Sequence, residues 1–224
     1  MTTATRIHPG LVIRQTLTLY RRLASVWLPG SIVVFGIAGI LAAIAVTISP
    51  LMIYVSFLIS DIAIALFTGM IVGLVADTRR NDESNMSVSQ LLGSIEPVFG
   101  RVILVGLVTG IGVFIGFIII VVPGLVLATI WSVATPVVVR ERPSGLRALG
   151  RSRELVRGNG WRVFSVIFVL IFLVGLLASG VDLAANSAGT GAGIVVRVII
   201  EIFTAPLGAL AGAILYLDLS QESE

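Results

Sequence analysis

The chain has no cysteine, no lysine and a single histidine, and few of its residues are charged. Without cysteine there are no disulfides, no thiolate nucleophiles and no cysteine–metal sites. The one histidine, His8, lies near the N-terminus, so the long apolar runs contain no histidine base or metal ligand. The sequence also has no Walker A pattern. We therefore predict that the protein is not an enzyme and holds neither a metal nor a cofactor.

Apolar residues dominate what remains. Hydrophobic residues make up 57% of the 224 residues, and charged residues only 12%. A soluble domain usually carries about a quarter charged residues, and its core could not bury this much apolar surface. Backbone groups in lipid find partners only within helices. We therefore predict an all-α integral membrane protein that forms one domain over residues 1–224.

Six apolar runs are each long enough to cross about 30 Å of hydrocarbon as a helix. They cover residues 31–48, 51–76, 98–122, 124–140, 161–185 and 194–217. Short breaks at Ser49-Pro50, Pro123-Gly124 and residues 186–193 pair these runs into three hairpins. All arginines except Arg197 lie before, between or after the hairpins or within four residues of the hairpin ends on that same side, so the positive-inside rule places both termini in the cytoplasm.

An amphipathic segment precedes each hairpin. Arginines cover one face of residues 143–158 when they are wound as a helix, and residues 9–28 show the same pattern. A weaker copy follows the capping-box pair Ser87 and Gln90. Such helices are typical of the membrane interface, with the apolar face in lipid and arginines among anionic headgroups. The predicted headgroup-binding residues are Arg14, Arg21, Arg22, Arg147, Arg151, Arg153 and Arg157. The alternative is that these arginines only set the topology.

Four ionisable residues interrupt the apolar runs: Asp61, Asp182, Arg197 and Glu201. Inserting an ionisable residue at membrane depth costs ~2.5 kcal/mol or more, so we expect each of these residues to have a structural or functional role. Arg197 and Glu201 share a helix face, and their depth allows a cluster with Asp61. We favour an ion-pair network that holds the second and sixth spans together. The alternative is a site for a substrate or a proton.

Small residues and prolines add two expectations about packing. Span three carries Gly106, Gly110, Gly112 and Gly116, and this spacing lets helices approach closely in lipid, which predicts a contact helix. Pro136 and Pro206 predict kinks in the fourth and sixth spans.

Short motifs between Pro123 and Phe164 and near the C-terminus suggest a relationship. They are Pro123-Gly124, Pro136, Glu141, Ala148-Leu149, Arg151-Ser152, Leu155-Val156, Arg157-Gly158-Asn159, Trp161-Arg162-Val163, Pro206 and Leu215 to Leu219 ("LYLDL"). In these motifs the chain resembles the membrane domain of bacterial glycerophosphoryl diester phosphodiesterases and the related YciC-like membrane proteins. The resemblance implies a multi-pass protein of the bacterial inner (cytoplasmic) membrane. It implies no phosphodiesterase activity, because we expect no room here for the separate catalytic domain that some members carry.

These patterns favour a non-enzymatic membrane protein that engages anionic lipid at the cytoplasmic face and supports membrane organisation or a partner protein. The alternative is a small transporter or lipid-translocating protein that uses Asp61, Arg197 and Glu201. The expected partners are membrane lipids, with anionic ones preferred. Nucleic acid is not expected, because the arginines lie beside apolar runs. A protein partner or a homo-oligomer stays open.

Overall fold

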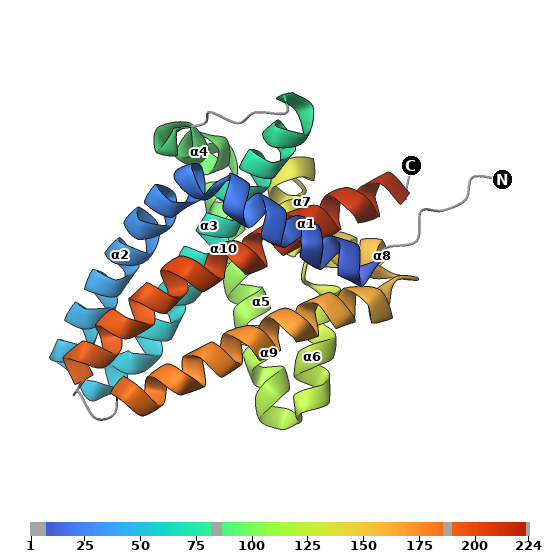
Figure 1. Ribbon diagram of the computed structural model, residues 1–224. Helices are drawn as coiled ribbons and strands as arrows, with labels where there is room; N and C mark the ends of the chain where they lie inside the picture. Colours follow the sequence, from blue (N-terminus) through green and yellow to red (C-terminus); the bar gives the residue numbers. More distant parts are fainter. Residues whose placement is uncertain (1–7, 82–86, 186–189, 223–224) are drawn as a thin grey trace.

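The computed structural model describes residues 8–81, 87–185 and 190–222, and within these ranges the chain is helical and has no β-strand (Figure 1). The α-helices are α1 (Pro9–Arg22), α2 (Ala24–Ile48), α3 (Ile53–Asn81), α4 (Val88–Ile95), α5 (Phe99–Ile119), α6 (Val121–Ile130), α7 (Ala134–Glu141), α8 (Arg147–Val156), α9 (Gly160–Ala185) and α10 (Thr190–Glu222). Two short 3-10 helices, η1 (Pro50–Met52) and η2 (Glu96–Val98), precede α3 and α5. The side chain of Asp182 and residues 186–189 of the last predicted hairpin loop lie outside the described residues.

Within the described residues, five helical segments, two of which combine neighbouring helices, are long and apolar enough to cross a membrane. They are Ala24–Ile48, Ile53–Arg79, Ser89–Ile119, Val121–Glu141 and Gly193–Gln221. Helices α8 and α9 meet the same criteria together over Arg147–Val156 and Gly160–Leu176, although they are bent by 107°. The number rises to six if this bent pair is one span. The predicted all-helical class is therefore confirmed, and the helices suit a multi-pass membrane protein.

Helix α3 lies at the centre of the bundle and packs against α2, α5 and α10 (Figure 1). Helix α1 crosses α10, and α9 contacts α10, α6 and α1. Helix α5 links α3 to α6 through its glycines. Gly106 and Gly110 face Ala65 and Asp61 of α3, whereas Gly112 and Gly116 face Trp131 and Gly124. Side chains at these glycines would collide with their neighbours, so the prediction that span three is a contact helix is confirmed.

The first predicted helix boundaries are partly wrong. The helix expected over residues 9–28 ends at Arg22, and Leu23 (φ −96°, ψ 12°) separates it from α2. Helix α2 therefore begins at Ala24, before the predicted start at residue 31. The apolar residues of this segment are thus divided between two helices. A single helical period does not reveal a break that only one residue makes.

Two further boundaries also differ from the prediction. The second hairpin turns at Ile120, which is extended (φ −160°, ψ 147°), and Pro123-Gly124 lies inside the first turn of α6. Proline is tolerated there because its missing N–H would have had no helical partner. Helix α8 begins at Arg147 rather than at Pro143, since Arg142 and Gly145 have positive φ angles of 53° and 47°.

The fourth span is broken, as Pro136 predicts. Residues 131–133 form turns between α6 and α7, and Pro136 lies in the first turn of α7. Proline has no N–H to offer the carbonyl of Ser132 four residues earlier. At Pro206, in contrast, α10 is continuous. The fourth span is therefore interrupted near its proline, whereas the last helix continues through Pro206.

The apolar face predicted for the basic helix is confirmed, but its partner is protein. The buried residues of α8 are Ala148, Leu149, Ser152, Leu155 and Val156. Their apolar side chains join a core cluster that includes Val138 of α7 and Leu215 of α10. The prediction that this face lies in lipid is therefore wrong, because periodicity identifies a buried face without identifying what covers it.

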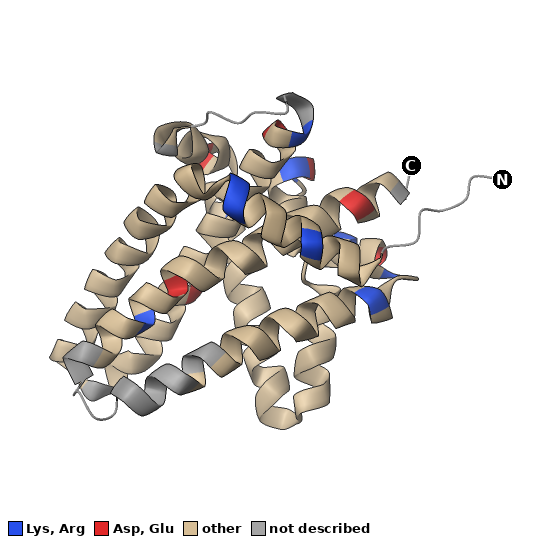
Figure 2. Ribbon diagram, viewed as in Figure 1, with Lys and Arg blue, Asp and Glu red and all other residues tan. Residues whose placement is uncertain are grey.

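Charged residues gather at one end of the bundle, where α1, α8 and the C-terminal end of α10 lie (Figure 2). In this view the connection between α2 and α3 and the hairpin of α5 and α6 form the other end, which is drawn as uncharged. In the uncharged half, Figure 2 shows charged segments on α10, and Asp61 of α3 also lies there. The predicted functional residues therefore fall into two regions, a basic end and an intramembrane group.

Candidate functional site

Helices α8 and α9 meet at a sharp elbow. Arg157 (φ −60°, ψ 127°) leaves α8 in extended backbone. Gly158 has a φ of 93°, a region that residues with a Cβ rarely adopt. The carbonyl of Asn159 then accepts a hydrogen bond from the N–H of Arg162 at 2.9 Å, and Asn159 Oδ1 accepts one from Arg162 Nη1 at 2.7 Å. These residues fix the 107° bend between the two helices.

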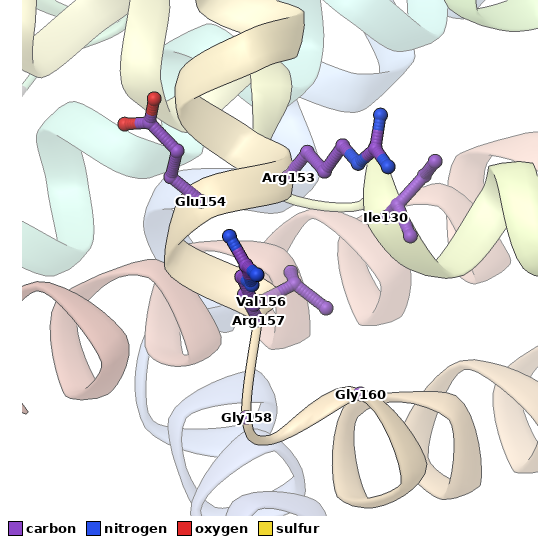
Figure 3. Close-up of a pocket in the computed structure, with 7 residues that line it drawn as sticks. All are labelled: Ile130, Arg153, Glu154, Val156, Arg157, Gly158 and Gly160. Atoms are coloured by element: carbon purple, nitrogen blue, oxygen red, sulfur yellow. The ribbon is translucent and has the colours of Figure 1, made fainter.

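The inside of this bend encloses a hollow of about 380 Å³, which we call the elbow hollow (Figure 3). It is lined by Ile130, Arg153, Glu154, Val156, Arg157, Gly158 and Gly160. The Arg153 side chain extends toward Ile130, and the Glu154 carboxylate lies on the opposite side of the α8 ribbon (Figure 3). Within the described part of the chain, the guanidinium groups of Arg153 and Arg157 make no hydrogen bond or ion pair.

The electrostatics of the elbow hollow favour an anion. Two guanidinium groups line it, and Gly160 is the first residue of α9. The first N–H groups of a helix have no intrahelical partner, and the helix dipole adds partial positive charge at this end. Glu154 is the one carboxylate in the lining, and it also contacts Arg151 Nη1 at 3.5 Å. Guanidinium groups beside a helix N-terminus are a typical binding arrangement for a phosphate or carboxylate.

Arg151 was predicted to bind headgroups with its neighbours, but the structure gives it protein partners. Its Nε donates to Glu141 Oε2 at 3.0 Å, and its Nη1 donates to Glu154 Oε2 at 3.5 Å. Glu141 Oε1 also accepts from the Tyr216 hydroxyl at 3.2 Å. Partial burial lowers the pKa of Arg151, but hydrogen bonds and charges from the two glutamates outweigh this effect and raise its pKa. Arg151 thus connects α8 to α7 and, through Glu141, to α10.

The remaining predicted headgroup residues lie on exposed helix surfaces. Arg14, Arg21 and Arg22 line a second, open hollow of about 650 Å³ along α1. Helix α1 packs on the bundle through Val12 and Thr16, so this arginine face points outward. Leu17 lines the same hollow and is 49% exposed. Arg147 is exposed at the start of α8.

The structure divides the predicted intramembrane cluster. Arg197 Nε lies 3.2 Å from Glu201 Oε1 on α10. Glu201 Oε2 accepts a hydrogen bond from Ser60 Oγ at 3.5 Å, and the Arg197 guanidinium carbon lies 4.6 Å from the centroid of the Phe57 ring. Ser60 and Phe57 belong to α3, so these contacts join the second and last predicted spans. This is the arrangement that the ion-pair interpretation describes.

Asp61 has different neighbours. Its carboxylate occupies the space beside Gly110 of α5 that a Cβ would fill. Its Oδ2 atom is shielded from solvent and has no hydrogen-bond partner among the described residues. The structure therefore does not bring Asp61 into the network of Arg197 and Glu201. Among the described residues, no three histidine or acidic side chains come together as a metal site would require.

The sequence predicted Arg153 and Arg157 as headgroup-binding residues but did not predict the hollow that they line. Gly158 and Gly160 follow the end of α8, and Gly160 also begins α9 beside these arginines. The available signal was a glycine-flanked break between a basic helix and an apolar run. Comparisons with family models, curated proteins and solved structures give no match to this chain. The resemblance to the phosphodiesterase-associated membrane domain therefore stays a prediction.

Proposed function

We propose that the protein is a non-enzymatic, multi-pass membrane protein that binds an anionic lipid headgroup in the elbow hollow. One observation carries this proposal. Arg153, Arg157 and Gly160 at the N-terminus of α9 line one hollow, and neither guanidinium has a partner among the described residues. A phosphodiester supplies the anion that this arrangement favours. Such binding would support membrane organisation or the docking of a partner protein.

We further propose a topology that puts the hollow at headgroup level. Three hairpins give six spans, α1, α4 and α8 lie at the cytoplasmic face, and both termini are cytoplasmic. The gathering of charge at one end of the bundle supports this orientation. Trp161 directly follows Gly160 and is 79% exposed. Exposed tryptophan is enriched at membrane–water interfaces, which also supports placing the start of α9 there.

The transport alternative has less support from the predicted cluster. Arg197 and Glu201 pair with each other, and Ser60 completes the contacts of Glu201. A paired group that joins two helices needs no substrate to explain its presence in the membrane. We therefore assign these two residues to helix packing.

Native mass spectrometry of the purified protein in neutral detergent, with phosphatidylglycerol or phosphatidylcholine added, tests the proposal. We expect preferential retention of phosphatidylglycerol. The variant Arg153→Gln/Arg157→Gln is expected to bind it roughly 30-fold more weakly, at about 1 kcal/mol for each basic residue.

The matched control is Arg140→Gln/Arg142→Gln, which removes the same charge outside the hollow. Both of these arginines are exposed, and we expect the control to retain the lipid. Equal losses in the two double variants would mean that the arginines act only through total charge. Equal retention of the two lipids by the wild type would also overturn the proposal.

A further inference from the structure

Three buried polar atoms of the bundle have no partner among the described residues. Asp61 Oδ2, Thr109 Oγ1 and Ser132 Oγ are shielded from solvent and make no hydrogen bond within the described residues. They belong to α3, to α5 and to the break between α6 and α7. A buried polar atom without a partner is costly, and in a native structure it often indicates a water or an ion.

The contacts of α5 place these three residues around one helical turn. Gly110 touches the Asp61 carboxylate, and Gly112 touches the ring of Trp131, which directly precedes Ser132. Successive residues of an α-helix are rotated by about 100°. Thr109 therefore lies on the arc of α5 between the face that meets α3 and the face that meets α6.

This arc of α5 points into the protein rather than toward lipid. Val102 and Val105 precede Thr109 at helical spacing on the same arc, and both are fully buried. They share one core cluster with Ala65 of α3 and with Val133. Asp61 lies one turn before Ala65, and Ser132 directly precedes Val133. The apolar core therefore changes to a polar layer at the level of Asp61, Thr109 and Ser132.

The break between α6 and α7 adjoins Ser132. Helix α6 ends at Ile130, and its carbonyl end carries the partial negative charge of the helix dipole, although the Ile130 carbonyl itself accepts a hydrogen bond from Ser152 Oγ at 2.8 Å. The polar groups around the layer are already used. Thr129 Oγ1 donates to the Leu125 carbonyl at 2.7 Å, and the Arg197–Glu201 pair neutralises its own charge at the α3–α10 contact.

We propose that Asp61, Thr109 and Ser132 bind a monovalent cation of sodium size at the break between α6 and α7. Their ligand atoms are all oxygens, which hard cations prefer. A single carboxylate is neutralised by a single positive charge, so a monovalent ion suits the layer better than a divalent one. Interrupted membrane helices bind sodium in this way, with the carbonyl ends of half-helices facing the ion.

Thermal unfolding of the purified wild type in neutral detergent tests this site. Sodium chloride is titrated against choline chloride at constant ionic strength, and binding of radioactive sodium is measured in parallel. We expect the Tm to rise with sodium and not with choline, because the ion joins three helical elements. Absence of a sodium-dependent rise or of sodium binding would mean that the three oxygens hold water only, and the proposal would fail.

Variants identify the ligands. Asp61→Asn and Thr109→Val are each expected to abolish the sodium-dependent shift. The matched control is Thr129→Val, which makes the same substitution at a hydroxyl that already has a protein partner, and it should retain the shift. If Asp61→Asn does not fold, Thr109→Val and Ser132→Ala decide the matter. Retention of the shift in either of these two, or its loss in Thr129→Val, would overturn the assignment.

Discussion

Ser60 and Asp61 are neighbours in α3, but their polar groups have opposite surroundings. Ser60 Oγ donates to Glu201 of α10, whereas Asp61 lies against Gly110 of α5 and its Oδ2 has no partner among the described residues. The rotation of about 100° between consecutive helical residues turns one toward α10 and the other toward α5. The depth of a polar residue in the membrane therefore does not determine its role. The helix that it faces does.

The same contrast occurs on α8 between Arg151 and Arg153. Arg151 binds Glu141 and Glu154, while Arg153 lines the elbow hollow without a protein partner among the described residues. Two residues of separation place side chains on nearly opposite sides of a helix. In both regions, polar residues close together in the sequence divide into one that holds helices together and one that we propose binds a ligand.

The largest effect is expected on the Asp61 side of α3. Gly110→Leu places a side chain where the Asp61 carboxylate lies, and such overpacking should cost about 3 kcal/mol of stability. Thermal unfolding and size-exclusion chromatography in detergent measure the loss. The control is Gly36→Leu in α2, because a Cβ there meets no atom within 4 Å. Equal stability of the two variants would show that α3 and α5 do not pack as described.

A smaller effect is expected on the Ser60 side. Glu201→Ala removes the partner of Arg197 and of Ser60, and it should destabilise the protein by about 2 kcal/mol. Arg197 is 50% exposed, which limits the penalty of leaving its charge unpaired.

The control for this pair is Arg197→Leu/Glu201→Leu. Replacing both partners of an ion pair by apolar residues is often neutral, so the double variant should recover most of the stability. If the double variant is as unstable as Glu201→Ala, Arg197 and Glu201 do not act as a pair. The assignment of the Ser60 side of α3 to helix packing would then be wrong. The measurement is thermal unfolding of both variants beside the wild type.

Local patterns predicted the helices well because apolar runs and caps are properties of neighbouring residues. The capping box of Ser87 and Gln90 is present, and the buried residues of α8 are those of the predicted apolar face. The partners of these faces depend on residues far apart in the chain. Glu141 is ten residues from Arg151 in the sequence, and Gly110 is also far from Asp61 in the sequence. Periodicity therefore could not show that Arg151 pairs with Glu141, or that Asp61 faces α5 rather than α10.

A variant at the bend between α8 and α9 tests the backbone geometry of the elbow hollow without changing its charge. Gly158→Ala keeps every arginine but forces an L-residue toward a φ of 93°, which should cost about 1 kcal/mol. It should also weaken phosphatidylglycerol binding, because the bend positions α9 against Arg153 and Arg157. The control Gly150→Ala lies inside α8 with no atom near its Cβ, and alanine there should stabilise the helix by roughly 0.5 kcal/mol. Loss of lipid in both variants would contradict a role for the bend.

The smallest effect on stability is expected from Arg151→Gln and Arg153→Gln, which compare two arginines of the same helix. Arg151→Gln should lower stability by about 0.5 kcal/mol, since it removes partly exposed ion pairs, and should leave phosphatidylglycerol binding unchanged. Arg153→Gln should weaken lipid binding by roughly fivefold, at about 1 kcal/mol for one basic residue, and leave the Tm unchanged. Both variants remove one positive charge from α8, so total charge predicts the same result for each. If Arg151→Gln loses only stability and Arg153→Gln loses only lipid binding, Arg151 is assigned to packing and Arg153 to the lipid. Equal loss of lipid binding in the two variants would mean that α8 acts only as a uniformly basic surface.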